Sequence, residues 1–157
     1  INYIPMSHEN NTQKSIEESD YIKDLMGKII GKKCKDNGDT KERNLDLNDI
    51  LIVAPFNMQV NNLNRNLPAN SKVGTIDKFQ GQEAKIVFIS MTASDPENIP
   101  RHKDFLFSRN RLNVGISRAE CVTFILFNPN LLNTSCQKIE EMRLINNFCK
   151  LLKYQIK

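Results

Sequence analysis

The stretch from Val73 to Ser90, VGTIDKFQGQEAKIVFIS, constrains the fold of this chain more than any other. It predicts a strand, a polar turn around Gly81, and a second strand at 86–89 made only of β-branched and aromatic residues. An apolar run without alternation is typical of a strand buried on both faces of a parallel sheet. Carboxamides and a carboxylate are costly to hold between two such strands, so a polar turn at this sheet edge indicates ligand contact.

The rest of the chain alternates between strand and helix patterns. Apolar strands are predicted at 1–5, 50–53 and 122–127, and amphipathic helices at about 12–30, 56–67, 106–118 and from about 134 onward. This order predicts an α/β sandwich around a mostly parallel sheet. The stretch 35–48 is rich in Asp, Asn, Lys and Gly, and we expect a surface loop with little function there. The 157 residues, 1–157, correspond to one ordinary domain.

Composition excludes several classes of protein. The longest apolar runs are far below the roughly 20 residues that cross a bilayer, and no signal peptide is visible, so we expect a cytoplasmic protein without membrane contact. The net charge of +4 favours polyanionic partners only mildly. The four cysteines are far apart and form no C-x-x-C pair, so reduced thiols are expected and no metal site. Ile1 as the first residue suits a fragment of a longer protein.

A second informative stretch, RNRLNVGISRAE, runs from Arg109 to Glu120, just before the strand at 122–127. Near the end of the predicted helix it carries Arg118, whose guanidinium keeps its proton and offers a fork of donors that fits phosphate oxygens. An arginine held there could stabilise charge on a transferring phosphoryl group. From these residues alone, an arginine paired with a carboxylate across a domain surface is the more ordinary interpretation.

Together these stretches resemble a known family. TIDKFQGQE followed by RNRLNVGISRA resembles motifs V and VI of superfamily 1 helicases, in the branch of the Upf and Dna-two type enzymes, and ILIVAPFNMQV resembles motif IV. The run RHKDFLFSRNRLNVGISRAE and the ending EMRLINNFCKLL are more similar still to the C-terminal part of bacterial proteins that fuse a RecB-like nuclease to such a helicase. The resemblance covers nearly all of the chain from Ile50 onward, and it is highly specific because three motifs occur in order.

The resemblance implies the second RecA-like domain of a two-domain, ATP-dependent motor, with a three-layer α/β sandwich. In that family ATP and Mg²⁺ bind in the cleft between two RecA-like domains, and single-stranded nucleic acid crosses the top of both. The implied partners are an N-terminal RecA-like domain of the same chain, a RecB-like nuclease domain, and a single strand, with DNA expected before RNA.

Residues that face the nucleotide in the family can be assigned to positions of this sequence by matching the motifs. Arg118 is similar to the arginine finger that reaches the γ-phosphate. Gln80, Gly81 and Glu83 match the motif V turn that faces the nucleotide, with Gln80 expected to take part in catalysis and Glu83 to lie near the ribose or an ordered water. Arg111 lies close to the motif VI helix, where a structural salt bridge is the favoured interpretation.

Residues that contact nucleic acid in the family can also be assigned to positions of this sequence. Thr75 and Asp77 match the part of motif V that touches the nucleic-acid backbone or relays to it. Pro55, Phe56 and Gln59 match motif IV, where backbone and side-chain groups contact a phosphate. For Phe56, a core aromatic or one beside the hinge is as good an interpretation as a platform for base stacking.

Several parts of the motor are missing from this sequence. No G-x-x-x-x-G-K-[ST] loop is found, because the run GKIIGKK at 27–33 has the wrong glycine spacing and lacks the Ser or Thr. No Asp-Glu pair follows a strand as a magnesium site requires. The chain is therefore expected to hold half an active site and to be inactive as an ATPase alone.

The sequence also departs from the family, and other functions stay open. Many relatives carry Ala in place of Gly115 and a basic residue in place of Glu120, although neither position is assigned to chemistry. One alternative is a non-catalytic nucleic-acid-binding module that uses the basic run 101–118 as its binding face. Another is a protein-interaction domain in which the motif residues are relics.

Overall fold

Strand β6 (Ala84–Ser90) lies at the centre of the sheet, and all of its residues are buried. The computed structural model describes residues 1–36, 38, 41–79, 81–95, 106–133, 136 and 138–152. The main sheet has five strands in the order β1-β7-β6-β4-β5, and every pairing in it is parallel. The other strands are β1 (Asn2–Pro5), β4 (Ile50–Val53), β5 (Lys72–Gly74) and β7 (Ala119–Phe127). The predicted parallel sheet is confirmed.

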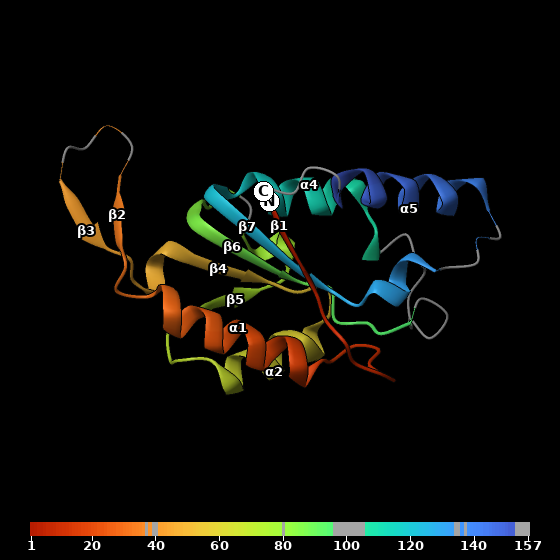
Figure 1. Ribbon diagram of the computed structural model, residues 1–157, viewed down its shortest axis with the longest axis horizontal. Coiled ribbons are helices and arrows are strands. Elements are labelled where there is room, and N and C mark those ends of the chain that lie inside the picture. The colour runs from red at the N-terminus through yellow and green to blue at the C-terminus, as the bar shows by residue number, and fades with distance from the viewer. Residues whose placement is uncertain are drawn as a thin grey trace.

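Helices cover both faces of this sheet and give three layers (Figure 1). The helices are α1 (Ile16–Ile29) and α2 (Asn57–Asn66) on one face, and α4 (Arg109–Ser117) and α5 (Ile139–Leu152) on the other. Three short 3-10 turns connect the elements: η1 (Leu47–Asp49), η2 (Ile76–Phe79) and η3 (Pro129–Leu132). The structure therefore confirms the predicted three-layer α/β fold.

The two helical layers explain why β6 shows no alternation of polar and apolar residues. Val87 and Ile89 belong to the apolar cluster that contains residues of α4 and α5. Ile86 and Phe88 belong to the cluster that contains residues of α1 and α2. Successive side chains of a strand point to opposite faces, so each face of β6 is covered by a different helical layer.

The stretch 35–48 contradicts its prediction, because part of it forms a β-hairpin. Strand β2 (Lys33–Lys35) pairs with β3 (Glu42–Asn44) in antiparallel register, and the hairpin projects beyond the main sheet (Figure 1). Arg43 holds its base: Nε lies 2.7 Å from Asp36 and Nη2 lies 2.6 Å from Asp49. Arg43 also keeps the pKa of Asp36 well below its usual range. Side-chain ion pairs, rather than apolar alternation, thus fix the hairpin.

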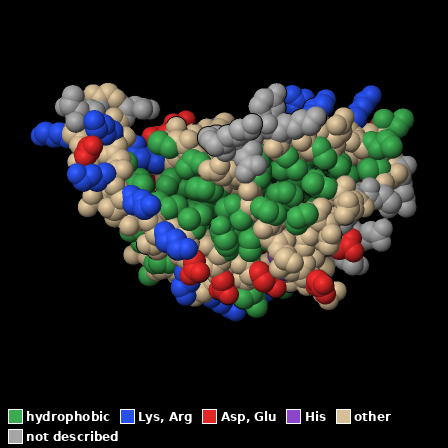
Figure 2. All heavy atoms as spheres, viewed as in Figure 1, with side chains coloured by type: hydrophobic (Ala, Val, Ile, Leu, Met, Phe, Trp, Pro, Cys, Tyr) green, Lys and Arg blue, Asp and Glu red, His purple; other side chains and the backbone are tan. Residues whose placement is uncertain are grey.

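The surface in Figure 2 shows how charge is distributed over one face of the molecule. Lys and Arg side chains gather on the projecting hairpin, while apolar side chains occupy the middle of the same face. Lys33, Lys35 and Lys41 are exposed there. The hairpin is therefore one of the places on this face where basic side chains gather.

Candidate functional site

The predicted site residues are divided between two opposite edges of the main sheet. Because all five strands are parallel, they begin at one edge, here named the amino edge, and end at the other, the carboxyl edge. Ala84 and Ala119 begin β6 and β7 at the amino edge. Pro55 and Thr75 follow the ends of β4 and β5 at the carboxyl edge.

At the amino edge, the polar turn meets Arg118. The turn leads into Ala84, whose backbone N–H donates to the carbonyl oxygen of Arg118 at 2.9 Å. Gly81 has a φ of +78°, a conformation that other residues adopt only with strain. Glu83 is exposed at this edge. Gln80 lies outside the described residues.

Arg118 ends α4, and its guanidinium folds back along that helix. Nε donates to the carbonyl oxygen of Val114 at 3.4 Å, and Nη2 donates to the hydroxyl of Ser117 at 3.5 Å. Both hydrogen bonds are at the long limit and therefore weak. Within the described ranges, no carboxylate forms an ion pair with Arg118. The described residues therefore do not supply the carboxylate partner that a purely structural role for Arg118 would require.

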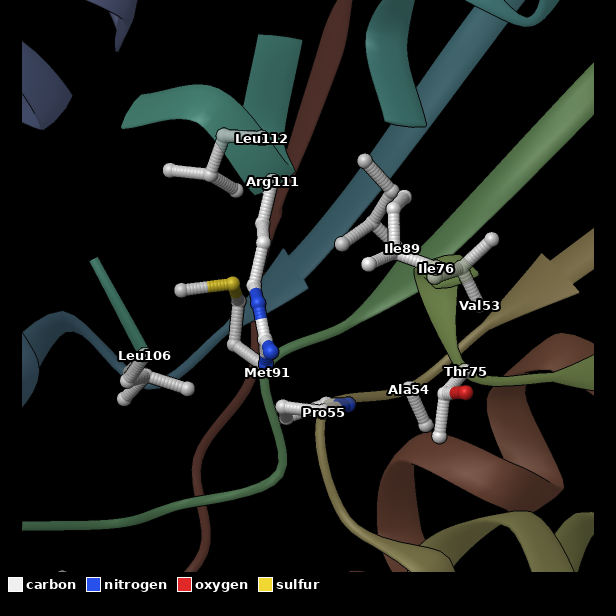
Figure 3. A pocket seen from close by; sticks show the side chains of 10 residues that line it. All are labelled: Val53, Ala54, Pro55, Thr75, Ile76, Ile89, Met91, Leu106, Arg111 and Leu112. Carbon is white, nitrogen blue, oxygen red and sulfur yellow. The ribbon is translucent and has the colours of Figure 1, made fainter. Parts of the chain in front are cut away.

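At the carboxyl edge, a mostly apolar pocket lies between the strand ends and α4 (Figure 3). Its lining comes from the ends of three strands, from the start of η2, from the segment before α4 and from α4 itself: Val53, Ala54, Pro55, Thr75, Ile76, Ile89, Met91, Leu106, Arg111 and Leu112. Figure 3 shows the side chain of Arg111 extending from α4 toward Pro55 and Met91. A hydroxyl and a guanidinium therefore border this pocket.

Arg111 also joins α4 to η2. Its Nη2 lies 3.8 Å from the carboxylate of Asp77, and the side chains are 38% and 65% exposed. The salt bridge predicted for Arg111 is confirmed. Because both groups face water, the pair contributes at most about 1 kcal/mol to stability, so the carboxylate of Asp77 stays accessible to other groups.

Two of the motif IV residues point inward. Phe56 is 5% exposed and belongs to an apolar core cluster, which favours the core interpretation over base stacking. The side chain of Gln59 is fully buried: its oxygen accepts from the N–H of Ser15 at 2.8 Å, and its nitrogen donates to the carbonyl of Ser15 and the hydroxyl of Ser90. Gln59 thus holds α2 against α1, and its carboxamide is closed to a phosphate.

The start of α2 nevertheless leaves backbone donors at the carboxyl edge. Phe56 is the N-cap residue, and no side chain caps the helix. The first N–H groups of a helix have no partner within it, and such a terminus is suited to binding anions. The start of α2 therefore presents backbone N–H groups that suit an anion, whereas the carboxamide of Gln59 is hydrogen-bonded in the interior.

Comparison with known proteins identifies the family of this chain. The profile of the AAA_12 family, described as an AAA domain, matches residues 4–130. The chain belongs to this family. It is 32% identical over 151 residues to an uncharacterized ATP-dependent helicase of Caenorhabditis elegans, covering 88% of this chain and 9% of that protein.

Two further relatives of this AAA domain are also named as helicases. The RNA helicase Mov10l1 of Mus musculus is 33% identical over 91 residues, which cover 54% of this chain and 8% of the relative. The DNA replication ATP-dependent helicase/nuclease dna2 of Schizosaccharomyces pombe is 32% identical over 87 residues, which cover 53% and 6%. The chain thus spans less than a tenth of the length of each of these relatives. These similarities identify a helicase-like domain of the superfamily 1 type.

The sequence analysis missed a buried polar network at the carboxyl edge of this AAA domain. The carboxylate of Glu18 accepts from the N–H of Thr92 at 3.0 Å and from the hydroxyl of Ser90, and it lies 3.3 Å from Nε2 of His8. Nδ1 of His8 lies 2.6 Å from the hydroxyl of Ser94. Burial raises the pKa of the Glu18 carboxyl. The sequence feature that could have revealed this network is an acidic residue, Glu18, in the apolar stripe of α1, at the helical spacing 18, 22, 26.

This network holds a strained residue in place. Thr92 has a φ of +72°, which is a genuine outlier for a β-branched side chain. Strain of this kind persists only where the surroundings over-determine the backbone, and it clusters at functional sites. The network thus fixes the direction in which the chain leaves β6.

The described residues form neither a metal site nor a membrane-spanning helix. No group of three His, Cys, Asp or Glu side chains there is arranged to hold a metal ion. Within the same ranges, no helix is both long enough and apolar enough to pass through a bilayer.

Proposed function

We propose that this chain is the second motor domain of an ATP-dependent superfamily 1 helicase. In this proposal the amino edge of the sheet faces a nucleotide, and the carboxyl edge forms part of the track for a single strand. The observation that carries it is the hydrogen bond between Ala84 and Arg118, which joins the motif V turn to the arginine of motif VI. Two motifs that are distant in sequence thereby reach one edge, as a shared ligand requires.

The groups at the amino edge fit the phosphates and ribose of ATP. Arg118 would supply a permanent cation with several donors toward the γ-phosphate, and such an arginine stabilises charge in the transition state. The backbone at Gly81 and the exposed carboxylate of Glu83 would lie toward the sugar. Gln80, which lies outside the described residues, is proposed as a catalytic residue from the family resemblance alone. The Mg²⁺ ion and the phosphate cradle would come from the first RecA-like domain, because the motifs that form them are not in this sequence.

The groups at the carboxyl edge fit the backbone of a single strand. The uncapped start of α2 after Pro55 offers N–H donors, and the hydroxyl of Thr75 and the guanidinium of Arg111 border the neighbouring pocket. Phosphate contacts of this type hold a strand without reading its sequence. Asp77 would act through its pair with Arg111 rather than by touching a phosphate, because two anions repel.

The first test concerns ATP hydrolysis. The full-length protein should hydrolyse ATP faster when a single strand is added, and the 157-residue chain alone should show no turnover under the same conditions. The reason is that the phosphate cradle and the metal site belong to the other domain. Steady nucleic-acid-stimulated turnover by the pure 157-residue chain would contradict the proposal.

The second test concerns the single strand. The chain should bind matched DNA and RNA oligonucleotides weakly, and log Kd should rise with log salt with a slope of about 0.7 for each phosphate contacted. Fluorescence anisotropy at several salt concentrations measures this slope. An affinity that is indifferent to salt would instead favour the protein-interaction alternative. The ratio of the two affinities tests the expected preference for DNA.

A further inference from the structure

We propose that Lys85 is a positioning residue for Arg118, and that it acts through Glu120 at the start of β7. This proposal rests on the proposed function, since it assigns Lys85 a part in the same reaction. The lysine does not itself face the nucleotide edge as a ligand. Its effect is to fix the backbone on which Arg118 is carried.

Lys85 is a buried cation with several partners. Its side chain is only 5% exposed, and its Nζ lies 2.7 Å from Asp36 and 3.4 Å from Glu120. The same nitrogen donates to the carbonyl oxygen of Lys35 at 3.1 Å. Lysine is almost never buried without such pairing. One ammonium thus ties together β6, β7 and the base of the β2–β3 hairpin.

The register of β6 and β7 shows what this ammonium holds. Ala84 pairs with Ala119 and Ile86 pairs with Val122, so two residues of β7, Glu120 and Cys121, lie opposite Lys85 alone. This is a β-bulge, which bends its strand and changes the direction of nearby side chains. The pair between Lys85 and Glu120 crosses the bulge and fixes it.

The bulge lies directly beside Arg118. Glu120 follows Arg118 by two residues, and the carbonyl of Arg118 is held by the N–H of Ala84, the residue before Lys85. A shift of the bulge would therefore move the backbone of Arg118 and the end of α4. The guanidinium itself has only long hydrogen bonds to its own helix, so its position depends on that backbone.

Replacing Lys85 in the full-length protein tests this role. Lys85→Met should lower kcat for ATP hydrolysis at least about tenfold, because small displacements of a catalytic group are costly, while KM for ATP stays within about twofold. Lys85→Arg should restore most of kcat. Glu120→Gln should lower kcat in the same way, and the double variant should be no worse than Lys85→Met alone. A wild-type kcat in Lys85→Met, or additive losses in the double variant, would overturn the proposal.

Controls separate positioning from folding. Lys33→Met removes an ammonium from strand β2 of the hairpin. Its ion pair with Glu42 is exposed, so the substitution should leave kcat unchanged. If Lys85→Met does not fold, the kcat of Glu120→Gln tests the positioning role instead. The side chain of Glu120 is 34% exposed, so its replacement is better tolerated. Thermal unfolding of each variant shows which of them are folded.

Hydrogen exchange gives a readout that does not depend on ATP hydrolysis. In Lys85→Met, backbone amides of the peptides covering 83–86 and 117–121 should exchange faster than in wild type, and those of Lys33→Met should not. Unchanged exchange in Lys85→Met would overturn the positioning role. If the wild-type protein fails to hydrolyse ATP, the proposed function fails, and the exchange rates still decide whether Lys85 holds this edge.

Discussion

Arg118→Ala should lower kcat for ATP hydrolysis in the full-length protein by about 10³ to 10⁵, the loss expected for an arginine finger. Binding of ATP should change little, because in the proposed arrangement the phosphate cradle belongs to the first RecA-like domain and the arginine acts mainly on the transition state. The geometry leaves the charge of Arg118 available for this role. Among the described residues Arg118 pairs with no carboxylate, so its charge is available to a ligand at the amino edge.

Two matched variants sharpen this experiment. Arg118→Lys keeps the charge but loses the forked donors, so it should recover little of the activity. Arg65→Ala removes an exposed arginine in the last turn of α2 and should behave as wild type. Single-turnover assays measure the chemical step, and a fluorescent ATP analogue measures binding. Loss of ATP binding in Arg118→Ala with unchanged turnover at saturation would contradict the assigned role.

Glu18→Ala should lower the free energy of unfolding by about 3 to 5 kcal/mol, since it removes one partner from a buried network. The N–H of Thr92, the hydroxyl of Ser90 and the ring of His8 would all lose an acceptor. Each buried group left without a partner costs about 1–3 kcal/mol. The strained backbone at Thr92 would also lose a contact that holds it.

The neighbouring glutamate provides the control. Glu17 is exposed, and its carboxylate accepts from the side chains of Asn11 and Ser15 at the surface, so Glu17→Ala should cost about 1 kcal/mol or less. Urea unfolding of both variants measures the difference. Equal losses in Glu17→Ala and Glu18→Ala would show that the buried network contributes nothing of its own.

The same network should make the free energy of unfolding depend on pH. Burial raises the pKa of Glu18 above its ordinary value of 4.5, so the folded state holds this proton more tightly than the unfolded chain. The resulting contribution to stability is fully present below pH 4.5 and is lost as the pH rises through the raised value. Glu18→Gln cannot titrate, so its stability relative to wild type should improve over that rise.

The sequence predicted those parts of the fold that depend on local pattern. The apolar run 86–89 becomes the buried core of β6, and α1 falls within the helix predicted at about 12–30. The resemblance implies that the turn before β6 and Arg118 both face the nucleotide, which requires them to lie at one edge of the sheet. The backbone bond from Ala84 to Arg118 places the described part of that turn there.

What could not be predicted depends on pairing between distant residues. The β2–β3 hairpin has little apolar alternation, and it is held by Arg43, Lys85 and their carboxylate partners. Gln59 was predicted to contact a phosphate, but its carboxamide instead bonds to the buried backbone of Ser15. The sequence of a helix does not show whether a polar side chain will face a ligand or a distant stretch of backbone. Periodicity shows which face of an element is apolar, not which polar groups meet inside.

Hydrogen exchange of the full-length protein can show whether nucleotide binds at the amino edge and nucleic acid at the carboxyl edge. A slowly hydrolysed ATP analogue should protect peptides covering 81–86 and 117–121. A single-stranded oligonucleotide should protect those covering 54–60 and 74–79. Protection of the carboxyl-edge peptides by the analogue, with none at the amino edge, would contradict this assignment.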